Sequence, residues 1–312
     1  MSTLALEVHQ LTKRYGRGRQ AFLAVQDLSL TLAAGEVLAF LGPNGAGKTT
    51  AIKAIAGLIV PDQGQIRIAG RDPHREPAAL SHLGAVLEGN RNLYWRLTVQ
   101  ENLAYFGALK GLGPAQVRRR SGELLARFGL AAKRDDLVQT LSRGMQQKLA
   151  IAVAILHEPH LLLLDEPTLG LDVEATQDVK QLVREIAAAG CAILLTTHQL
   201  QIAEELAHQV AIIQGGVIVA EATPQALIAQ FAGQAYQVEL AAPLDSTRRE
   251  KLAHLGVHLR GDRQLWVPDT ELLYRTLALL EPLPLVRVHK EQSTLTDVFL
   301  TLVQTPPSPR AL

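Results

Sequence analysis

The stretch Gly42-Pro43-Asn44-Gly45-Ala46-Gly47-Lys48-Thr49 decides how the rest of this sequence is interpreted. It matches the pattern G-x-x-x-x-G-K-[ST], which arises by chance in roughly one chain in a hundred of this length. An apolar run at residues 37–41 precedes it, and a helical pattern begins at Thr49. A strand before the stretch and a helix after it predict a phosphate-binding loop, not a glycine-rich surface turn.

Phosphate binding by such a loop follows from its residue types. Glycines let the backbone fold tightly around phosphate oxygens, at a helix N-terminus whose dipole favours negative charge. We expect Lys48 to bridge the β- and γ-phosphates of a nucleotide and the Thr49 hydroxyl to bind Mg²⁺. The candidate nucleotide-binding residues of the loop are Gly42, Pro43, Asn44, Gly45, Ala46, Gly47, Lys48, Thr49 and Thr50.

Two carboxylates follow a second apolar run at residues 161–164. After a phosphate loop, Asp165 is expected to complete the Mg²⁺ shell through water. Glu166 comes next in the chain, so its side chain points to the other side, toward an attacking water. General-base action of this kind is worth about 10²- to 10⁴-fold in rate. The pair therefore predicts nucleotide hydrolysis.

Short strand-like runs alternate with helical patterns through the first two thirds of the chain, which predicts a parallel sheet covered by helices. The expected strands are residues 4–11, 28–32, 37–41, 65–68, 161–164, 192–195 and 210–213. Residues 99–157 read almost entirely as helix, with a break at 111–114, and predict a helical subdomain inserted into this α/β core. The first domain is expected to span residues 1–231.

The pattern changes after about residue 230. Residues 232–304 are expected to form a second, smaller domain, and residues 305–312 a flexible tail. The expected elements of this domain are strands at 236–240, 257–259, 264–267 and 286–289 and helices at 247–255, 271–280 and 295–303. The order β-α-β-β-α-β predicts a ferredoxin-like α+β unit.

Composition limits the possible partners. Lys plus Arg total 31 against 30 for Asp plus Glu, a net charge of +1, so no broad basic field predicts nucleic-acid binding. The single cysteine, Cys191, excludes an internal disulfide and indicates a reducing compartment. No uncharged apolar run approaches the roughly 20 residues that cross a bilayer. We therefore expect a cytoplasmic chain that can still dock on a membrane protein.

Three further motifs follow in a fixed order: LSRGMQQ at residues 141–147, DEPTLGLD at 165–172 and LLTTH at 194–198. Together with the phosphate loop they resemble the ATP-binding subunit of ABC transporters over roughly residues 4 to 231. The fold class that this implies is a P-loop NTPase of the ABC type, with its inserted helical subdomain, followed by the small ferredoxin-like domain. The resemblance implies ATP and Mg²⁺ as cofactors.

The resemblance also implies roles for single residues. Tyr15 is similar to the aromatic residue that stacks on adenine, although a tyrosine at a strand end can simply pack in the core. His198 is similar to the switch histidine that contacts the γ-phosphate, and with Glu166 it forms the catalytic pair. In the family, Ser142 and Gly144 would grip the nucleotide of a second copy, so that a homodimer encloses two ATP molecules. Asp172 would communicate across that interface.

Two departures from the family pattern stand out. The signature carries Arg143 where a glycine is usual and Met145 where a glutamine is usual. The lid position that normally holds glutamine is occupied by Glu88. An ionised carboxylate cannot donate a hydrogen bond, but it can ligate Mg²⁺, so Glu88 is a third candidate metal ligand beside Thr49 and Asp165.

A separate transmembrane permease is the partner that the resemblance implies. In the family its coupling helix docks after the lid, where Tyr94 and Trp95 either line a docking groove or fill the subdomain core. The C-terminal unit resembles an accessory domain of drug, antibiotic and polymer exporters. We therefore expect the ATP-hydrolysing subunit of an ABC exporter, peripheral on the inner face of the cell membrane. The alternatives are a soluble ABC ATPase acting on DNA or the ribosome and, more distantly, a phosphate-loop kinase.

Overall fold

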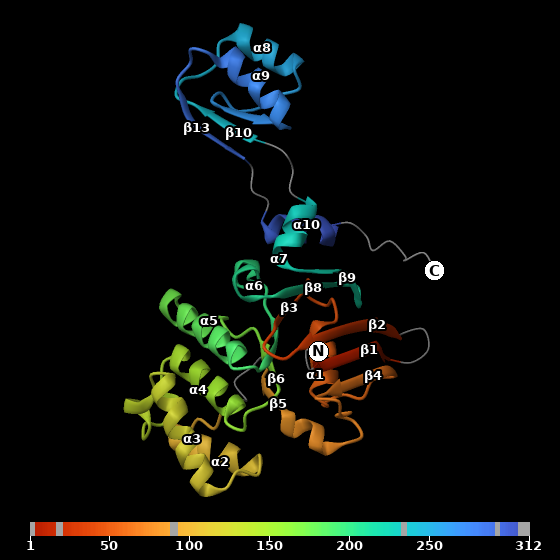
Figure 1. Cartoon of the computed structure of the whole chain (residues 1–312), viewed down its shortest axis with the longest axis vertical. Coiled ribbons are helices and arrows are strands. Elements are labelled where there is room, and N and C mark those ends of the chain that lie inside the picture. The colour runs from red at the N-terminus through yellow and green to blue at the C-terminus, as the bar shows by residue number, and fades with distance from the viewer. Residues whose placement is uncertain (1–3, 17–20, 88–92, 232–235, 291–293, 305–312) are drawn as a thin grey trace. The chain divides into compact units, whose positions relative to one another are not determined.

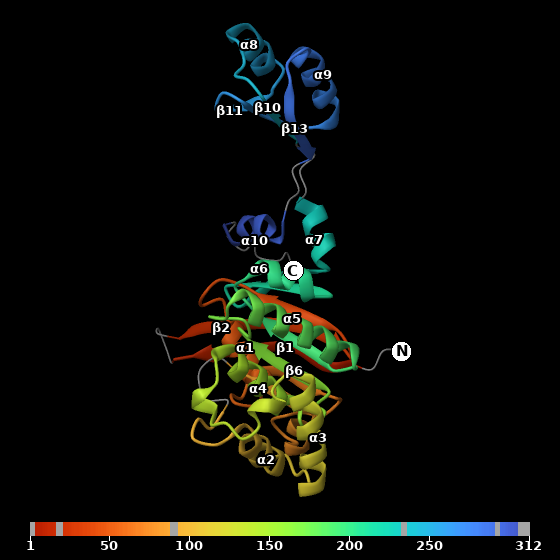
Figure 2. The same ribbon diagram turned by 90° about the vertical axis from the view of Figure 1, so that its left-hand side faces the viewer.

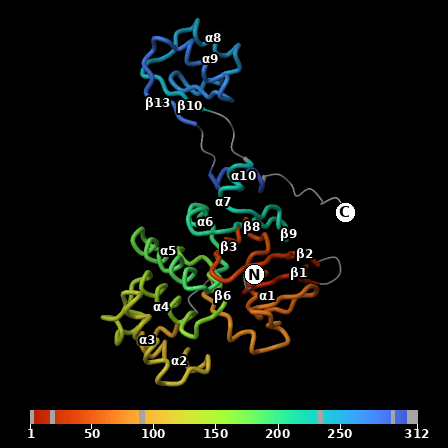
Figure 3. Tube along the Cα trace, viewed as in Figure 1, coloured from red at the N-terminus to blue at the C-terminus, as the bar shows by residue number. Residues whose placement is uncertain are grey.

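The computed structural model describes residues 4–16, 21–87, 93–231, 236–290 and 294–304. The chain divides into two compact units, one of residues 1–224 with 302–312 and the other of residues 225–301. Figure 3 follows the chain through both. Each unit is described by itself below.

The first unit is built on a six-stranded sheet with the order β5-β6-β7-β3-β8-β9. The first five strands in this order are parallel, and β9 is antiparallel to β8. Every residue of β3, β6 and β7 is buried, as expected for strands covered on both faces. The strands are β3 (Val37–Leu41), β5 (Leu83–Val86), β6 (Leu161–Asp165), β7 (Ala192–Thr196), β8 (Gln209–Gln214) and β9 (Val217–Ala222).

A second, antiparallel sheet of the same unit has the order β2-β1-β4. Its strands are β1 (Leu4–Tyr15), β2 (Phe22–Ala33) and β4 (Gln63–Ile68). Helix α1 (Lys48–Ile55) shares one hydrophobic core with both sheets, in which Leu6, Leu38 and Ile52 are buried together. The phosphate loop therefore emerges where the two sheets meet.

Helices cover the other face of the six-stranded sheet (Figures 1 and 2). The inserted segment holds α2 (Val99–Leu109), α3 (Pro114–Arg127) and α4 (Arg143–Ile155), followed along the chain by α5 (Val173–Ala188) and α6 (Leu200–Leu206). Short 3-10 helices occur at Pro77–His82, Ala131–Lys133 and Val138–Thr140. A capping box fixes the start of α2. The Thr98 side chain accepts a hydrogen bond from the Glu101 backbone N–H, and the Glu101 side chain accepts one from the Thr98 backbone N–H.

The second unit contains a four-stranded antiparallel sheet with the order β11-β12-β10-β13. Along the chain its elements follow the order β-α-β-β-α-β, and the sheet order is that of a ferredoxin-like unit. These elements are β10 (Tyr236–Leu240), α8 (Ser246–His254), β11 (His258–Arg260), β12 (Gln264–Val267), α9 (Thr270–Leu280) and β13 (Leu285–Lys290). The chain also forms α7 (Pro224–Phe231) and α10 (Leu295–Gln304). Within the described part of the chain, no helix combines the length and apolarity needed to cross a bilayer.

A glycine lets β5 press against α4. A Cβ at Gly84 would lie 2.3 Å from the Ala154 carbonyl oxygen. We predict that Gly84→Ala lowers the free energy of unfolding by about 1–3 kcal/mol, because the backbone must shift to admit a methyl group. Urea denaturation followed by circular dichroism measures this change.

Gly122→Ala is the matched control, because a Cβ at this position in α3 meets nothing within 4 Å. Alanine is the better helix former by about 1 kcal/mol, so this variant should be as stable as the parent or more so. Equal responses of the two variants would contradict the close contact between β5 and α4.

Candidate nucleotide-binding site

The phosphate loop runs from the end of β3 to the start of α1, and two of its glycines are forced by close backbone contacts. A Cβ at Gly42 would lie 2.4 Å from the Ile213 carbonyl oxygen on β8. A Cβ at Gly47 would lie 2.3 Å from the Ala24 carbonyl oxygen on β2. Gly47 also has φ 110°, in the region that favours glycine. The loop therefore passes between β8 and β2, and at Gly42 and Gly47 the two strands leave no space for a side chain.

Helix α1 begins directly at Lys48, with Gly47 as its N-cap and no side chain capping it. The first-turn N–H groups of such a helix lack intrahelical partners, and its dipole favours an anion there. A glycine loop that ends in an uncapped helix start has the chemistry of a phosphate cradle. This observation fits the triphosphate that the sequence predicts.

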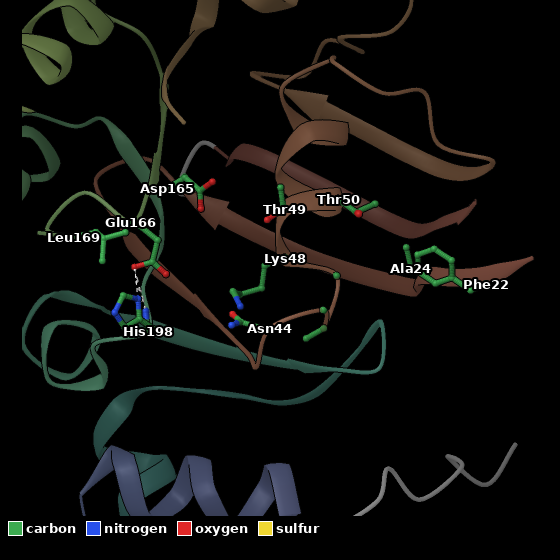
Figure 4. A pocket seen from close by; sticks show the side chains of 13 residues that line it. Phe22, Ala24, Asn44, Lys48, Thr49, Thr50, Asp165, Glu166, Leu169 and His198 are labelled. Atoms are coloured by element: carbon green, nitrogen blue, oxygen red, sulfur yellow. Dashed lines mark hydrogen bonds and ion pairs between the residues drawn. The ribbon is translucent and has the colours of Figure 1, made fainter. Parts of the chain in front are cut away.

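The Lys48 side chain folds back across the loop. Its Nζ donates hydrogen bonds to the carbonyl oxygens of Gly42 (2.6 Å) and Pro43 (3.1 Å). Burial lowers the pKa of the Lys48 ammonium, while the nearby carboxylates of Glu166 and Asp165 oppose that shift. The ammonium is thus held over the loop, opposite two acids (Figure 4).

The two carboxylates are directed apart by the backbone. Asp165 ends β6, is buried, and accepts a hydrogen bond from the Thr196 hydroxyl on the adjacent strand β7. Glu166 has φ 52°, a left-handed conformation that is uncommon for a non-glycine residue and often marks a functional site. Its Oε2 lies 2.9 Å from Nδ1 of His198 and accepts from the His198 backbone N–H at 3.3 Å. Glu166 and His198 therefore form a contacting pair.

An open cleft of about 330 Å³ brings most of these groups together. Its lining residues are Phe22, Ala24, Asn44, Gly45, Ala46, Gly47, Lys48, Thr49, Thr50, Asp165, Glu166, Leu169 and His198. The candidates of the loop from Asn44 to Thr50 and the acid–histidine pair thus share one cavity. Gly42 and Pro43 are not among the described lining residues, but their carbonyl oxygens accept hydrogen bonds from Lys48, which is one of them.

Three lining residues were missed by the sequence interpretation: Phe22, Ala24 and Leu169. Tyr15 is not among the described residues that line the cleft; its ring stacks on Phe22 instead, with centroids 5.8 Å apart. Phe22 could have been found from its position, because it starts the strand that follows Tyr15. Leu169 lies within the DEPTLGLD motif and could have been found from its spacing to Glu166.

Ser142, Gly144 and Asp172 do not appear among the described residues that line this cleft. They lie at two helix starts that pack on each other. Ser142 Oγ accepts from the Met145 N–H at 3.3 Å and caps α4, and Asp172 Oδ1 accepts from the Ala175 N–H at 2.8 Å and caps α5. A Cβ at Gly144 would lie only 2.7 Å from the Ala175 Cβ. Among the described residues, these three therefore lie outside the lining of their own chain's cleft.

The three residues that depart from the family pattern, Arg143, Met145 and Glu88, differ in what the structure shows of them. A Cβ at Gly170 would lie 3.2 Å from Nη1 of Arg143, so this guanidinium reaches the loop after Glu166. The Met145 side chain packs against the hydrophobic core. Glu88 lies outside the residues that the structure describes.

Tyr94 and Trp95 are exposed, at 48% and 42%, so they do not fill the subdomain core. The Tyr94 ring lies 4.8 Å from that of Tyr105, and their hydroxyls are 3.2 Å apart. The fully buried Asn102 holds the Tyr94 backbone, accepting from its N–H at 2.8 Å and donating to its carbonyl oxygen at 3.0 Å. A fixed aromatic surface results at the start of α2.

Comparison with known proteins gives concordant matches. The family described as "ABC transporter" matches residues 25–169. The daunorubicin/doxorubicin resistance ATP-binding protein DrrA of Streptomyces peucetius is 36% identical, over 99% of this chain and 95% of that protein. The Nod factor export ATP-binding protein I of Paraburkholderia xenovorans (strain LB400) is 36% identical, over 97% of this chain and 98% of that protein.

Solved structures agree with the sequence comparisons. An ATP-binding subunit of an ABC transporter superposes with a TM-score of 0.65 at 35% identity, covering 73% of this chain and 93% of that one. A dimeric ATP-binding cassette in a post-hydrolysis state, bound to ADP and Pi, has a TM-score of 0.62 at 25% identity, with coverages of 70% and 98%. This chain therefore belongs to the ATP-binding subunits of ABC transporters and is an ABC-type ATPase.

Proposed function

We propose that this chain powers export: two copies close around two Mg²⁺-ATP molecules and drive a separate membrane permease. The observation that carries the ATPase part is the cleft in which the Lys48 loop faces the Glu166–His198 pair. Export is supported by full-length similarity to one protein named for drug resistance and another named for Nod factor export. The accessory domain, residues 232–304, would stabilise or regulate the dimer.

Hydrolysis is assigned to the residues around the phosphate end of the cleft. The Glu166 carboxylate orients and deprotonates the attacking water, and His198, in contact with Glu166, binds the γ-phosphate. Lys48 exchanges its two loop carbonyls for phosphate oxygens. Thr49 and Asp165 line the cleft with a hydroxyl and a carboxylate, oxygen donors that suit Mg²⁺, and Glu88 is a further proposed ligand. Mg²⁺ bound by these residues would supply charge neutralisation at the phosphate oxygens.

The dimer is inferred from the position of Ser142, Gly144 and Asp172 outside the described lining of their own cleft. Ser142 and Gly144 stand at a helix N-terminus, a position that favours an anion. A second copy can present this surface to a triphosphate that the first copy holds. We assign the γ-phosphate contacts of Ser142 and Gly144 to the partner copy's nucleotide, and contact across the interface to Asp172.

The permease would place the chain on the inner face of the cell membrane. The exposed Tyr94 and Trp95 are assigned to its docking surface. A kinase would leave Ser142, Gly144 and His198 without a role, and the named relatives are resistance and export proteins, not proteins of DNA or the ribosome. Export is therefore the function that fits best.

Glu166→Gln tests the assigned base. The amide keeps the shape of the side chain but cannot accept the proton, so steady-state ATP hydrolysis should fall by about 10²- to 10⁴-fold. ATP binding should persist, and the variant should accumulate as a dimer in Mg²⁺-ATP. Phosphate release and size-exclusion chromatography measure the two effects.

Glu123→Gln is the control for that experiment. Glu123 pairs with Arg119 on the exposed side of α3, so the same chemical change there should leave hydrolysis near the parent rate. Undiminished turnover by Glu166→Gln would reject Glu166 as the base.

A site shared between two copies predicts complementation. Neither Lys48→Ala nor Ser142→Arg should hydrolyse ATP alone, because each disables both sites of a homodimer. Mixed together, they should regain about a quarter of parent activity, since half of the random dimers are mixed and each has one intact site of two.

The double variant Lys48→Ala/Ser142→Arg mixed with the parent chain separates this arrangement from a site complete within one chain. For shared sites its mixed dimers contain no intact site, so their formation should reduce parent activity. A different outcome would contradict shared sites: mixed dimers of the double variant and the parent chain are active, and the mixture of the two single variants regains no activity. Ser142 would then contact the nucleotide bound by its own chain.

Trp95→Ala tests the docking surface. The variant should retain its fold, because Trp95 is 42% exposed, and lose much of its co-purification with the proposed permease from detergent-solubilised membranes. Tyr274→Ala, which removes a 69% exposed aromatic side chain from α9, is the control. Equal recovery of the permease with both variants would remove Trp95 from the interface.

A further inference from the structure

Two histidines face each other where two neighbouring strands of the six-stranded sheet begin. His82 ends the 3-10 helix that precedes β5, and His160 directly precedes β6. The two strands are parallel, and Leu83 is the register partner of Leu161, so the histidines stand one position before a strand pair. The His160 backbone N–H donates to the His82 carbonyl oxygen at 2.9 Å. The backbone therefore holds the two side chains next to each other.

The two imidazole rings bring two nitrogen atoms into close contact. Nδ1 of His82 lies 3.0 Å from Nδ1 of His160, and the ring planes are 78° apart. A metal ion binds imidazole nitrogen at about 2.0–2.1 Å, so two such ligands in neighbouring positions of one ion lie about 2.8–3.4 Å apart. The observed separation falls within this range. A metal ion can therefore replace the proton that the two nitrogens share, with only a small rotation of the rings.

The surroundings of the pair suit a metal ligand. Nζ of Lys110, at the end of α2, donates to the Leu83 carbonyl oxygen at 3.1 Å and so fixes the backbone beside His82. Burial lowers the pKa of His82, and the charges of His160 and Arg71 lower it further. The His82 ring is thus neutral, which is the form that binds a metal. His160 is exposed, so the pair is open to an ion from solvent.

The ligand set indicates the kind of ion. Among the described residues, no group of three or more His, Cys, Asp or Glu could hold a metal, so water must complete the coordination of an ion at this pair. A third histidine, His157, is engaged elsewhere, because its Nε2 donates to the Leu83 carbonyl oxygen at 3.0 Å. Imidazole ligands suit Zn²⁺, Ni²⁺ and Cu²⁺, whereas Mg²⁺ prefers oxygen ligands. The pair therefore fits an exchangeable transition-metal ion and not the Mg²⁺ of a nucleotide.

We propose that His82 and His160 form a binding site for a divalent transition-metal ion, held through the two Nδ1 atoms. The site is separate from the nucleotide cleft, because neither histidine is among the described residues that line the cleft. His160 and Glu166 also flank opposite ends of β6. A bound ion joins the segment before β5 to the segment before β6 and stabilises this edge of the sheet.

Zn²⁺ titrated calorimetrically into the full chain, without nucleotide, tests the site. The variants are His82→Gln and His160→Gln, because glutamine keeps a hydrogen-bonding side chain but its amide is a poorer ligand than imidazole for these ions. Each variant should bind Zn²⁺ more than about tenfold more weakly than the parent chain. Zn²⁺ should raise the Tm of the parent chain but not that of either variant, since only the parent chain binds it tightly.

His254→Gln is the matched control, because His254 is an exposed histidine at the end of α8. This variant should bind Zn²⁺ as the parent chain does. ATP hydrolysis in Mg²⁺ should stay at the parent rate in all three variants, which shows that their fold is retained and keeps this test independent of the proposed function.

Electron paramagnetic resonance of the parent chain with one equivalent of Cu²⁺ needs no variant. The spectrum should show hyperfine coupling to two imidazole nitrogens. The proposal is overturned if Cu²⁺ couples to fewer than two, if the parent chain does not bind Zn²⁺, or if either variant of the pair binds Zn²⁺ as tightly as the parent chain. A lower Tm in both variants, with no effect of Zn²⁺ on the parent chain, would show that the two histidines only share a hydrogen bond.

Discussion

The path of the phosphate loop between β8 and β2 is the constraint on which the rest of the site depends. Side chains at Gly42 or Gly47 would collide with backbone carbonyl oxygens on these two strands. Since a backbone carbonyl in a sheet cannot move aside cheaply, the loop has one route and α1 has one starting point. That starting point places Lys48 opposite the ends of β6 and β7. The acids and the histidine of the cleft follow from the same sheet.

The charges of the cleft favour a triphosphate that is accompanied by Mg²⁺. Asp165 and Glu166 lie opposite the Lys48 ammonium, whose pKa is lowered by burial, and two carboxylates would repel a bare triphosphate. Hydrogen bonds to its own loop carbonyls hold the Lys48 ammonium. Triphosphate oxygens are stronger acceptors than these carbonyls, because a bond between charged groups exceeds one to a neutral acceptor. Binding therefore replaces weaker contacts of Lys48 with stronger ones without requiring a new site to form.

The sequence predicted the architecture because its signals were local. Continuous apolar runs gave the buried strands β3, β6 and β7, and the glycine–lysine spacing located the loop. What could not be predicted depends on contacts between distant segments. The left-handed backbone of Glu166 is set by its tie to Thr196, thirty residues away, and Phe22 reaches the cleft only because β2 folds back beside β1. Neither leaves a periodic pattern in the sequence.

The position of α4 and α5 explains why one copy of the chain holds only part of a nucleotide site. Their starts are locked together by the close approach of Gly144 and Ala175, and each is capped by its own side chain. The loop from Thr168 to Asp172 joins this rigid pair to Glu166, with Leu169 in the cleft and Gly170 under Arg143. Movement at the helix starts must therefore be transmitted to the wall of the chain's own cleft. Under the proposed function, the start of α4 contacts the partner's triphosphate and packs on the start of α5. The five residues 167–171 join Asp172, at the start of α5, to Glu166, the base that acts on the chain's own nucleotide. This connection gives the two sites of a dimer a physical means of acting in concert.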